Sequence, residues 1–241
     1  MVTSETLLRR TFDTVDALAT LTRPDEILAV ASEQFRDFGY SAFVLSRLPR
    51  TTSNIEPFIL LNGWPDGWTE RYVEADHYER DPLRRYCMST EHVFSWDDIP
   101  NDLIEDKRAA AVVHEAGAFG FSQGLCVPLH TQFGAGGLSL AGAGVEEAPG
   151  MRAMIRLLAF YLCSAVERTR ADTRTLPQLT PRERDILTWV ALGKTAPEIA
   201  AHLCISDYTV THHLQNVRMK LGTRNNAHSV AIALRAGQIA I

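Results

Sequence analysis

The chain has 241 residues, of which 46% are apolar, and a formal net charge of −5 at pH 7. This length and apolar content allow one large or two smaller hydrophobic cores and exclude a wholly disordered chain. The four cysteines stand singly with no C-x-x-C pair, so neither a zinc site nor a disulfide framework is expected. No basic segment leads into an apolar core near the start, and no apolar run approaches about 18 residues, so we expect a cytoplasmic protein with no membrane partner.

The first three quarters of the chain mix helical and strand patterns. Apolar residues recur at helical spacing in some segments, whereas others are short apolar runs bounded by glycine or polar residues. In chain order the predicted elements are helices over residues 5–20 and 24–38, strands over 41–47 and 58–61, helices over 68–77 and 102–118, strands over 123–129 and 137–143, and a helix over 149–172. This order predicts an α+β domain in which a central sheet has helices on both faces, an α-β-α sandwich.

A polar stretch, TRTLPQLTPRE, follows the last of these helices and contains Pro177 and Pro181. It predicts a linker over residues 173–179 between a first domain, residues 1–172, and a second, residues 180–241. Residues 176–241 hold seven Lys or Arg side chains against four Asp or Glu, whereas the first 175 residues hold 17 against 25. An acidic large domain joined to a small cationic one is typical of a DNA-binding unit attached to a regulatory body.

The second domain opens with a strong helix start. Thr180 can cap the helix, Pro181 suits the first helical position, and Glu183 completes a capping box. Gly193 is expected to end this helix. Its predicted buried face consists of Ile186, Leu187, Val190 and Ala191.

The stretch PEIAAHLCISDYTVTHHLQNVRMKL predicts two helices separated by a tight turn at Cys204–Ser206. Ser206 caps the second helix, which runs to about Leu221. Its core face consists of Val210, Leu214, Val217 and Leu221. The opposite face carries Tyr208, Thr211, His212, Gln215, Asn216 and Met219. This polar face without carboxylates is typical of a helix-turn-helix whose second helix enters the major groove, although the spacing alone also fits an ordinary solvated helical hairpin.

Residues 179–241 closely resemble the four-helix DNA-binding domain of LuxR-type transcription regulators. The matched positions are Glu183, Leu187, Gly193, Lys194, Glu198, Ile199, Ala200, Ser206, Thr209, Val210, His213, Asn216, Lys220, Leu221 and Ala227. The resemblance implies binding of double-stranded promoter DNA by a homodimer, with RNA polymerase as a further candidate partner. It also implies that Thr211 and Gln215 approach base edges, and the cations suited to phosphates are Lys194, Arg218, Lys220 and Arg224.

The input to such a domain is commonly a phosphorylated receiver or a small-molecule pocket. A receiver would begin with an apolar strand ending in an acidic pair, followed by a phosphoacceptor Asp and a late Lys. Here Asp97 and Asp98 follow Phe94-Ser95-Trp96 rather than an early strand, and Lys107 is the only lysine before the second domain. The sequence therefore does not support a receiver.

Residues 64–96 resemble instead the ligand-binding domain of LuxR-type receptors for acyl-homoserine lactones. The resemblance rests on Trp68, Tyr72, the Asp81-Pro82 pair and Trp96, with Gly124 and Ser139 matching farther on. Together the two resemblances cover roughly residues 20–241. They imply that the protein binds an acyl-homoserine lactone as a signal and uses no cofactor.

Such a lactone presents one amide N–H, two carbonyls and an apolar tail, so its pocket needs an acceptor, two donors and apolar walls. Asp81 suits the acceptor, the indole of Trp68 suits a donor to the lactone carbonyl, and Tyr72 and Trp96 suit the walls. Outside the resemblance, an Asp before Pro is commonly a cap, and aromatic residues at helical spacing are commonly core.

Trp64 departs from the family pattern, because many relatives carry a tyrosine whose hydroxyl helps hold the acyl carbonyl. A tryptophan donates one hydrogen bond, cannot accept one and is bulkier. Either Ser139 takes over the carbonyl, or the acyl group is short, branched or aromatic.

Two other functions would use parts of this sequence. A ligand-independent regulator with a vestigial pocket would keep the DNA-binding domain but would not need Asp81, Trp68, Tyr72 and Trp96. An enzyme that opens the lactone would need a metal cluster or an activated nucleophile, and the chain has neither H-E-x-x-H nor G-x-S-x-G. The sequence therefore favours a regulator over an enzyme. For the dimer contact, residues 151–166 offer an apolar stripe of Met154, Leu158, Tyr161, Leu162 and Ala165, although packing inside their own domain is an equal alternative.

Overall fold

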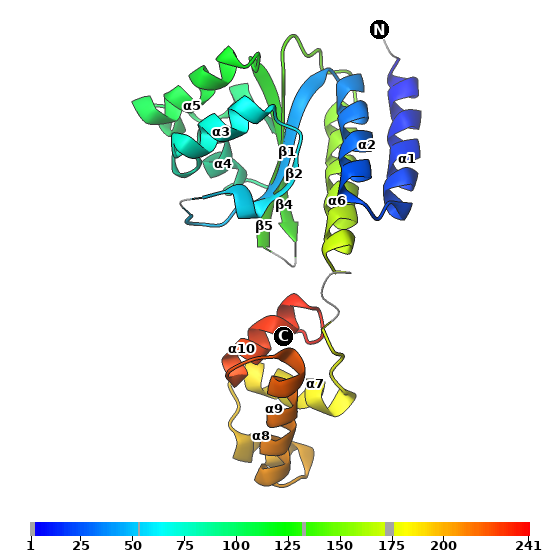
Figure 1. The fold of residues 1–241 in the computed structure, drawn as a ribbon, viewed down its shortest axis with the longest axis vertical. Helices are drawn as coiled ribbons and strands as arrows, with labels where there is room; N and C mark the ends of the chain where they lie inside the picture. The colour runs from blue at the N-terminus through cyan, green and yellow to red at the C-terminus, as the bar shows by residue number, and fades with distance from the viewer. Residues whose placement is uncertain (1–2, 53, 132–133, 172–175) are drawn as a thin grey trace. The chain divides into compact units, whose positions relative to one another are not determined.

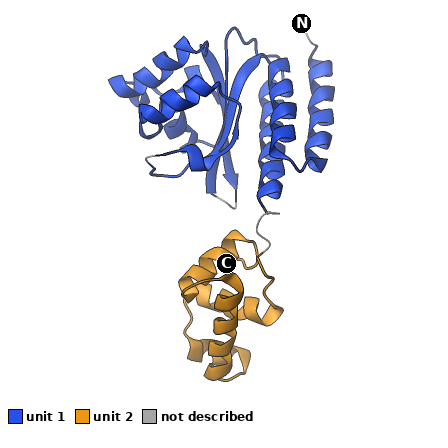
Figure 2. Cartoon of the chain, viewed as in Figure 1, with its two compact units in different colours: residues 1–172 blue, residues 173–241 orange. Residues whose placement is uncertain are grey.

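The computed structural model describes residues 3–52, 54–131, 134–171 and 176–241. The chain forms two compact units, residues 1–172 and residues 173–241 (Figure 2).

A five-stranded antiparallel sheet organises the first unit (Figure 1). Its strands are β1 (Tyr40–Arg47), β2 (Ile59–Asn62), β3 (Phe94–Ser95), β4 (Gln123–Thr131) and β5 (Gly134–Gly142). They lie in the order β2-β1-β5-β4-β3, so β1 and β4 flank the central strand β5. The β4–β5 hairpin pairs continuously from Gln123 with Gly142 to Thr131 with Gly134.

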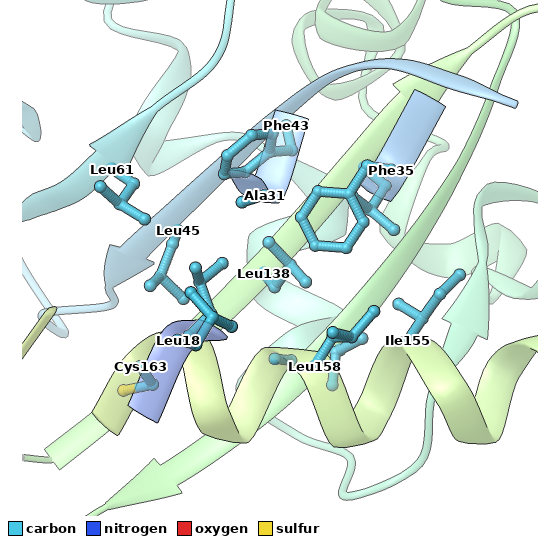
Figure 3. Close-up of a cluster of buried hydrophobic side chains, with 14 of the residues drawn as sticks. Leu18, Ala31, Phe35, Phe43, Leu45, Leu61, Leu138, Ile155, Leu158 and Cys163 are labelled. Atoms are coloured by element: carbon cyan, nitrogen blue, oxygen red, sulfur yellow. The ribbon is translucent and has the colours of Figure 1, made fainter. Parts of the chain in front are cut away.

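Three helices cover one face of the sheet, namely α1 (Ser4–Thr20), α2 (Pro24–Asp37) and α6 (Met151–Ala171) (Figure 1). Strand alternation sends Phe43, Leu45, Leu138 and Leu140 to this side, where they are at most 2% exposed. The core that they form with the three helices is shown in Figure 3, and Phe35 meets Phe43 edge-on with ring centroids 4.9 Å apart.

Three shorter helices lie on the other face of the sheet, namely α3 (Asp66–Glu74), α4 (Pro82–Cys87) and α5 (Lys107–Ala118) (Figure 1). Four short 3-10 turns stand among the described elements: η1 (Glu56–Phe58) before β2, η2 (His77–Glu79) between α3 and α4, and η3 (Trp96–Asp98) and η4 (Asn101–Leu103) between β3 and α5. Ala42, Cys126 and Ala141, the strand neighbours of the residues that face α1, α2 and α6, pack into this second core. The predicted α-β-α sandwich is therefore confirmed.

Most predicted elements of this unit begin or end within a few residues of the observed ones. Two elements were missed, the six-residue helix α4 and the two-residue strand β3, because both are too short to show a period. The helix predicted over residues 102–118 was wrong at its start, since α5 begins only at Lys107, where Asp106 accepts a bond from the backbone N–H of Arg108 at 3.1 Å. The helix predicted over residues 68–77 was too long, because Asp76 adopts a left-handed conformation with φ of 53°.

For the apolar stripe on α6, the alternative of packing inside its own domain is confirmed for four of the five residues. Met154, Leu158, Leu162 and Ala165 are buried in their own domain, at most 6% exposed. They face the sheet because they share one side of the helix with Ile155. Tyr161, on a different side, is 43% exposed.

The second unit contains α7 (Pro181–Ala191), α8 (Ala196–Leu203), α9 (Asp207–Leu221) and α10 (Asn226–Arg235) around a core of its own. The capping box predicted at Thr180 and Glu183 is confirmed, with N–H to oxygen distances of 3.3 and 2.7 Å. The predicted buried face of α9 is confirmed as well, since Val210, Leu214, Val217 and Leu221 are all buried. None of the described helices, in either unit, is long and apolar enough for a membrane span.

Candidate functional site

A cavity of about 70 Å³ lies in the first unit, between the second face of the sheet and α3, α4 and α5. Its wall is mostly apolar. It consists of residues of strands β1, β2, β4 and β5, of helices α3, α4 and α5, and of the segments between these elements. The structure brings all six predicted ligand-binding residues to this one wall, namely Trp64, Trp68, Tyr72, Asp81, Trp96 and Ser139.

Two of these side chains reach the cavity from α3 because they are four residues apart, on the same face of the helix. Trp68 and Tyr72 are each 4% exposed, and their ring centroids lie 5.8 Å apart at 67°. Trp64, just before α3, packs against both, at 6.2 Å from Trp68 and 5.2 Å from Tyr72. Phe119 and Phe121 also contact Trp68, with ring centroids 5.2 and 6.3 Å away, and we call this cluster of rings the aromatic cage.

Asp81 joins the cavity wall to the start of α4. Its Oδ1 accepts the backbone N–H of Leu83 at 2.8 Å and that of Arg84 at 3.4 Å, so it is the N-cap that an Asp before Pro commonly is. Its Oδ2 accepts the hydroxyl of Tyr72 at 2.6 Å. Burial raises the pKa of Asp81, against the lowering effect of these three hydrogen bonds. A carboxylate offers about four acceptor positions, so one remains for a ligand N–H.

The indole of Trp96 reaches the cavity because residue 124 is a glycine. A Cβ atom at Gly124 would overlap the indole nitrogen of Trp96 and the carbonyl of Leu140. This clash explains why a glycine is needed at position 124, one of the positions that match the family. The Nε1 atom of Trp96 is buried and has no hydrogen-bond partner among the described residues. Ser139 accepts a weak bond from Sγ of Cys126 at 3.6 Å, which leaves the Ser139 hydroxyl proton available to another acceptor.

Arg84 also lines the cavity, and sequence reasoning missed it. It is 8% exposed, whereas Arg85 beside it is exposed. A pair of adjacent arginines after Asp-Pro gives no periodic signal that separates a buried side chain from a solvated one.

A charged cluster ties α3 to α5 outside the cavity. Glu115 of α5 accepts from Arg71 of α3 at 2.6 and 3.0 Å and meets Nε2 of His77 at 3.1 Å. The bonds from Arg71 and then His77 lower the pKa of Glu115 to about 2. Since Val112 and Ala116 of α5 line the cavity, this cluster positions one of its walls.

In the second unit, a turn of three residues separates α8 from α9. Cys204 takes a left-handed conformation with φ of 52°, and Ser206 accepts the backbone N–H of Thr209 at 3.1 Å. On the outer face of α9, Thr211 and Gln215 are both exposed and one turn apart. Two helices joined by a tight turn, with exposed polar groups on the second, form the helix-turn-helix arrangement.

The four predicted phosphate contacts differ in their surroundings. Lys194 pairs with Glu198 at 3.2 Å, and Arg218 donates to the side chain of Asn226 at 2.7 Å. Lys220 donates to Glu183 at 2.7 Å, across 37 positions of sequence. Arg224 is exposed and has no ion pair with any residue in the described ranges.

The pairing of Lys220 has a structural role. Glu183 is 3% exposed, and burial alone would raise the pKa of its carboxyl. The bonds from Lys220 and Thr180 outweigh burial, so the pKa of Glu183 is lowered. Lys220 therefore neutralises a buried carboxylate that caps α7, and its amine is less available to a phosphate than the guanidinium of Arg224.

Comparison with known proteins covers both units. Residues 23–166 match the family described as "Autoinducer binding domain", and residues 177–233 match the family described as "Bacterial regulatory proteins, luxR family". The chain is 36% identical over 235 residues to the HTH-type quorum sensing-dependent transcriptional regulator RpaR of Rhodopseudomonas palustris, over 96% of this chain and 95% of the relative. It is 30% identical over 193 residues to the transcriptional activator protein LuxR of Aliivibrio fischeri, over 75% of this chain and 74% of the relative.

Solved structures show the same fold. The crystal structure of Escherichia coli SdiA matches with a TM-score of 0.73 at 23% identity, over 96% of this chain and 98% of that one. SdiA in complex with octanoyl-rac-glycerol matches with a TM-score of 0.74 at 24% identity, over 98% of this chain and 96% of that one.

Proposed function

Because the chain belongs to the LuxR family of bacterial transcription regulators and carries an autoinducer-binding domain, we propose that an acyl-homoserine lactone occupies its cavity and controls promoter binding by its second unit. The family consists of regulators rather than enzymes, and the proposal concerns which signal is bound and how. One observation carries it: Trp68, Tyr72, Asp81 and Trp96, separated by up to 28 positions of sequence, line one cavity.

The polar groups of the wall fit the head of such a lactone. The free acceptor position of Asp81 takes the amide N–H, and the indole N–H of Trp68 donates to the lactone carbonyl. The acyl carbonyl is left for Ser139 or for the unpartnered N–H of Trp96. Each donor and acceptor of the lactone head thus has a counterpart in the wall, and burial makes each bond costly to lose.

The aromatic cage supports a short, branched or aryl acyl group. Trp64 packs on Tyr72 and Trp68, so its ring occupies space that a smaller side chain would leave to an alkyl tail. A flat or branched acyl group can pack on these rings, whereas a long straight chain would need further room.

Exposed apolar side chains on α1 and α6 support a homodimer. Leu8 and Phe12 are one turn apart on α1 and are 46% and 53% exposed. Phe160 and Tyr161 on α6, the helix against which α1 packs, are each 43% exposed. We refer to these four residues as the α1–α6 surface. Because soluble monomers rarely leave several large apolar side chains this exposed, the surface suits a second copy of the chain.

A homodimer would present two α9 helices to DNA. In helix-turn-helix dimers the two recognition helices enter successive major grooves about 34 Å apart, on a two-fold site. Thr211 and Gln215 would reach base edges, and Arg224 would contact phosphate. Lys194, Arg218 and Lys220 would do so only if their present partners release them.

A thermal melt with a panel of lactones tests the proposed function. A ligand that binds only the folded protein stabilises it by about 2.7 kcal/mol at one hundred times its dissociation constant. We expect short, branched or aryl acyl-homoserine lactones to raise the melting temperature of the full chain. If no lactone in a panel that also includes long straight chains shifts the melt, the cavity is vestigial and the protein acts without this ligand.

A further inference from the structure

A second cavity, of about 210 Å³, lies at the end of the sheet where β1 and β4 begin and β5 ends. Its wall includes Tyr40 and Gln123, the first residues of β1 and β4, which both pair with Gly142 of β5. Arg152, near the start of α6, also belongs to this wall. Among the described residues, Trp96 alone lines both this cavity and the one proposed for the lactone. The second cavity is therefore a separate site.

The hydroxyl of Tyr40 is a polar group that faces this second cavity. The residue is only 3% exposed, and its hydroxyl has no hydrogen-bond partner among the described residues. Burial, followed by the charge of Glu147, raises the pKa of Tyr40 to about 12, whereas the charge of Arg152 lowers it. Glu147 and Arg152 both line the cavity, so the hydroxyl that responds to their charges lies on that side of the ring. Because polar groups of buried side chains are almost always paired, this hydroxyl indicates a partner in the cavity.

Carboxylates outnumber cations around the second cavity. Every nitrogen of the Arg152 guanidinium already donates to a carboxylate, two of them to Glu147 at 2.7 and 3.1 Å and the third to Asp98 at 3.3 Å. Asp97, which also lines the cavity, is exposed and forms no ion pair with any residue of the described segments. Three carboxylates thus surround one guanidinium, and that guanidinium is not free to bind an anion.

We propose that the second cavity binds a small primary amine in its charged ammonium form. An ammonium group has three N–H donors, and the wall offers acceptors in the carboxylates of Asp97 and Glu147 and in the hydroxyl oxygen of Tyr40. The rings of Tyr40 and Trp96 add aromatic surface, which attracts a cation and packs against a carbon chain. A neutral polyol could make similar hydrogen bonds but would gain nothing from the surplus negative charge. This ligand is distinct from the lactone, and its binding does not require the proposed function.

Three molecules with the same carbon backbone but different charges test this inference. Butane-1,4-diamine is a dication, butane-1,4-diol is neutral and succinate is a dianion. Titration calorimetry at constant ionic strength measures their affinities for the full chain as wild type, Tyr40→Phe, Asp97→Asn and Glu33→Gln. Glu33→Gln is the matched control, because this carboxylate belongs to α2 and lines a different hollow, between α1 and α2. No lactone is present in these titrations.

We expect wild type to bind the diamine and to show no binding of the diol or of succinate at up to about 10 mM. Asp97→Asn should weaken diamine binding about tenfold because it removes the unpaired charge, and Tyr40→Phe about fivefold because it removes one hydrogen bond. If Tyr40→Phe fails to fold, Asp97→Asn still decides the matter, since Asp97 is exposed. No binding of the diamine, equal affinity for the diamine and the diol, or wild-type affinity in Asp97→Asn would overturn the inference. So would a loss in Glu33→Gln as large as that in Asp97→Asn, because it would indicate a general attraction of cations to the acidic first unit.

Discussion

The hydroxyl of Tyr72 lies 2.6 Å from Oδ2 of Asp81, and this hydrogen bond joins α3 to the start of α4 inside the cavity wall. Burial, followed by the charge of Asp81, raises the pKa of Tyr72, which therefore stays protonated and remains the donor. The same carboxylate caps α4 through Oδ1. The residue proposed to bind the ligand is thus also a structural residue, and substitutions must separate the two roles.

Asp81→Asn separates them. An asparagine can still cap α4, so the melting temperature of the unliganded protein should change little compared with that of Asp81→Ala, which loses a cap worth about 1 kcal/mol. Lactone affinity should fall by about 1–3 kcal/mol in both variants, since a neutral amide is a weaker acceptor than a carboxylate and alanine is none. Calorimetric titration and thermal melts measure both effects. Wild-type lactone affinity in Asp81→Asn would show that the ligand does not bind this oxygen.

The pKa of Asp81 also predicts a pH dependence. Because burial raises the pKa of the folded, unliganded state above the unfolded value of about 3.9, the contribution of Asp81 to stability is fully present below pH 3.9 and is lost as pH rises through the folded value. Lactone affinity should move the opposite way, since the amide N–H is accepted best by the ionised carboxylate. Titrations at falling pH should show wild-type affinity decreasing as Asp81 becomes protonated, while Asp81→Asn, which cannot titrate there, shows a flatter profile. Parallel profiles for the two proteins would contradict the assignment.

The α1–α6 surface predicts a dimer that a single charge disrupts. Phe160→Glu places a carboxylate among exposed apolar side chains, so the sedimentation coefficient of the liganded protein should fall from that of a dimer to that of a monomer. The fold of the single chain should be retained, because Phe160 is 43% exposed in the chain itself, while loss of the dimer lowers the melting temperature by mass action. Leu192→Glu is the matched control, an apolar residue 55% exposed in the second unit. A Phe160→Glu protein that still sediments as a dimer would rule out this surface.

The second unit predicts different failures for two of its cations. Lys220→Met leaves the buried carboxylate of Glu183 without its cation, so the unit should lose about 1–3 kcal/mol of stability. Arg224→Ala should leave stability unchanged and make the salt dependence of DNA binding shallower by about one phosphate contact per subunit. Chemical denaturation and DNA titrations over a salt series measure the two effects. Unchanged stability in Lys220→Met would mean that its bond to Glu183 is incidental.

Gln215→Ala is the control for sequence reading in those titrations. It should weaken binding to the preferred duplex by about 1–3 kcal/mol and leave binding to a scrambled duplex unchanged, since glutamine can pair bidentately with adenine. An equal loss on both duplexes would mean that α9 does not read bases through this residue.

Local pattern was sufficient to predict the main elements, whereas the residues of the cavity wall needed the resemblance to a family. The capping box at Thr180, the buried face of α9 and the strands β4 and β5 each depend on residues a few positions apart, so their periods are visible in the sequence. Trp64, Trp68 and Asp81 could be assigned to a pocket only through the resemblance to a family, because nothing in their spacing distinguishes a pocket from a core.

What the sequence could not predict depends on contacts between distant segments. The bond from Lys220 to Glu183 spans 37 positions, and those from Arg84 to the carbonyls of Pro49 and Arg50 span 35 and 34. Such pairs are set by how helices pack, and the charged side chains themselves carry no periodic signal. For the same reason Lys220 was predicted to be a phosphate contact although its amine is already engaged.

We expect a lactone bound in the first unit to change DNA binding by the second. The most direct measurement is fluorescence anisotropy of a labelled duplex, selected by the protein from a random pool, with and without a lactone that raises the melting temperature. Saturating lactone should change the dissociation constant for DNA at least tenfold, and Asp81→Asn should need a higher lactone concentration for the same change. An identical dissociation constant for DNA with the cavity empty and with the lactone bound would contradict it.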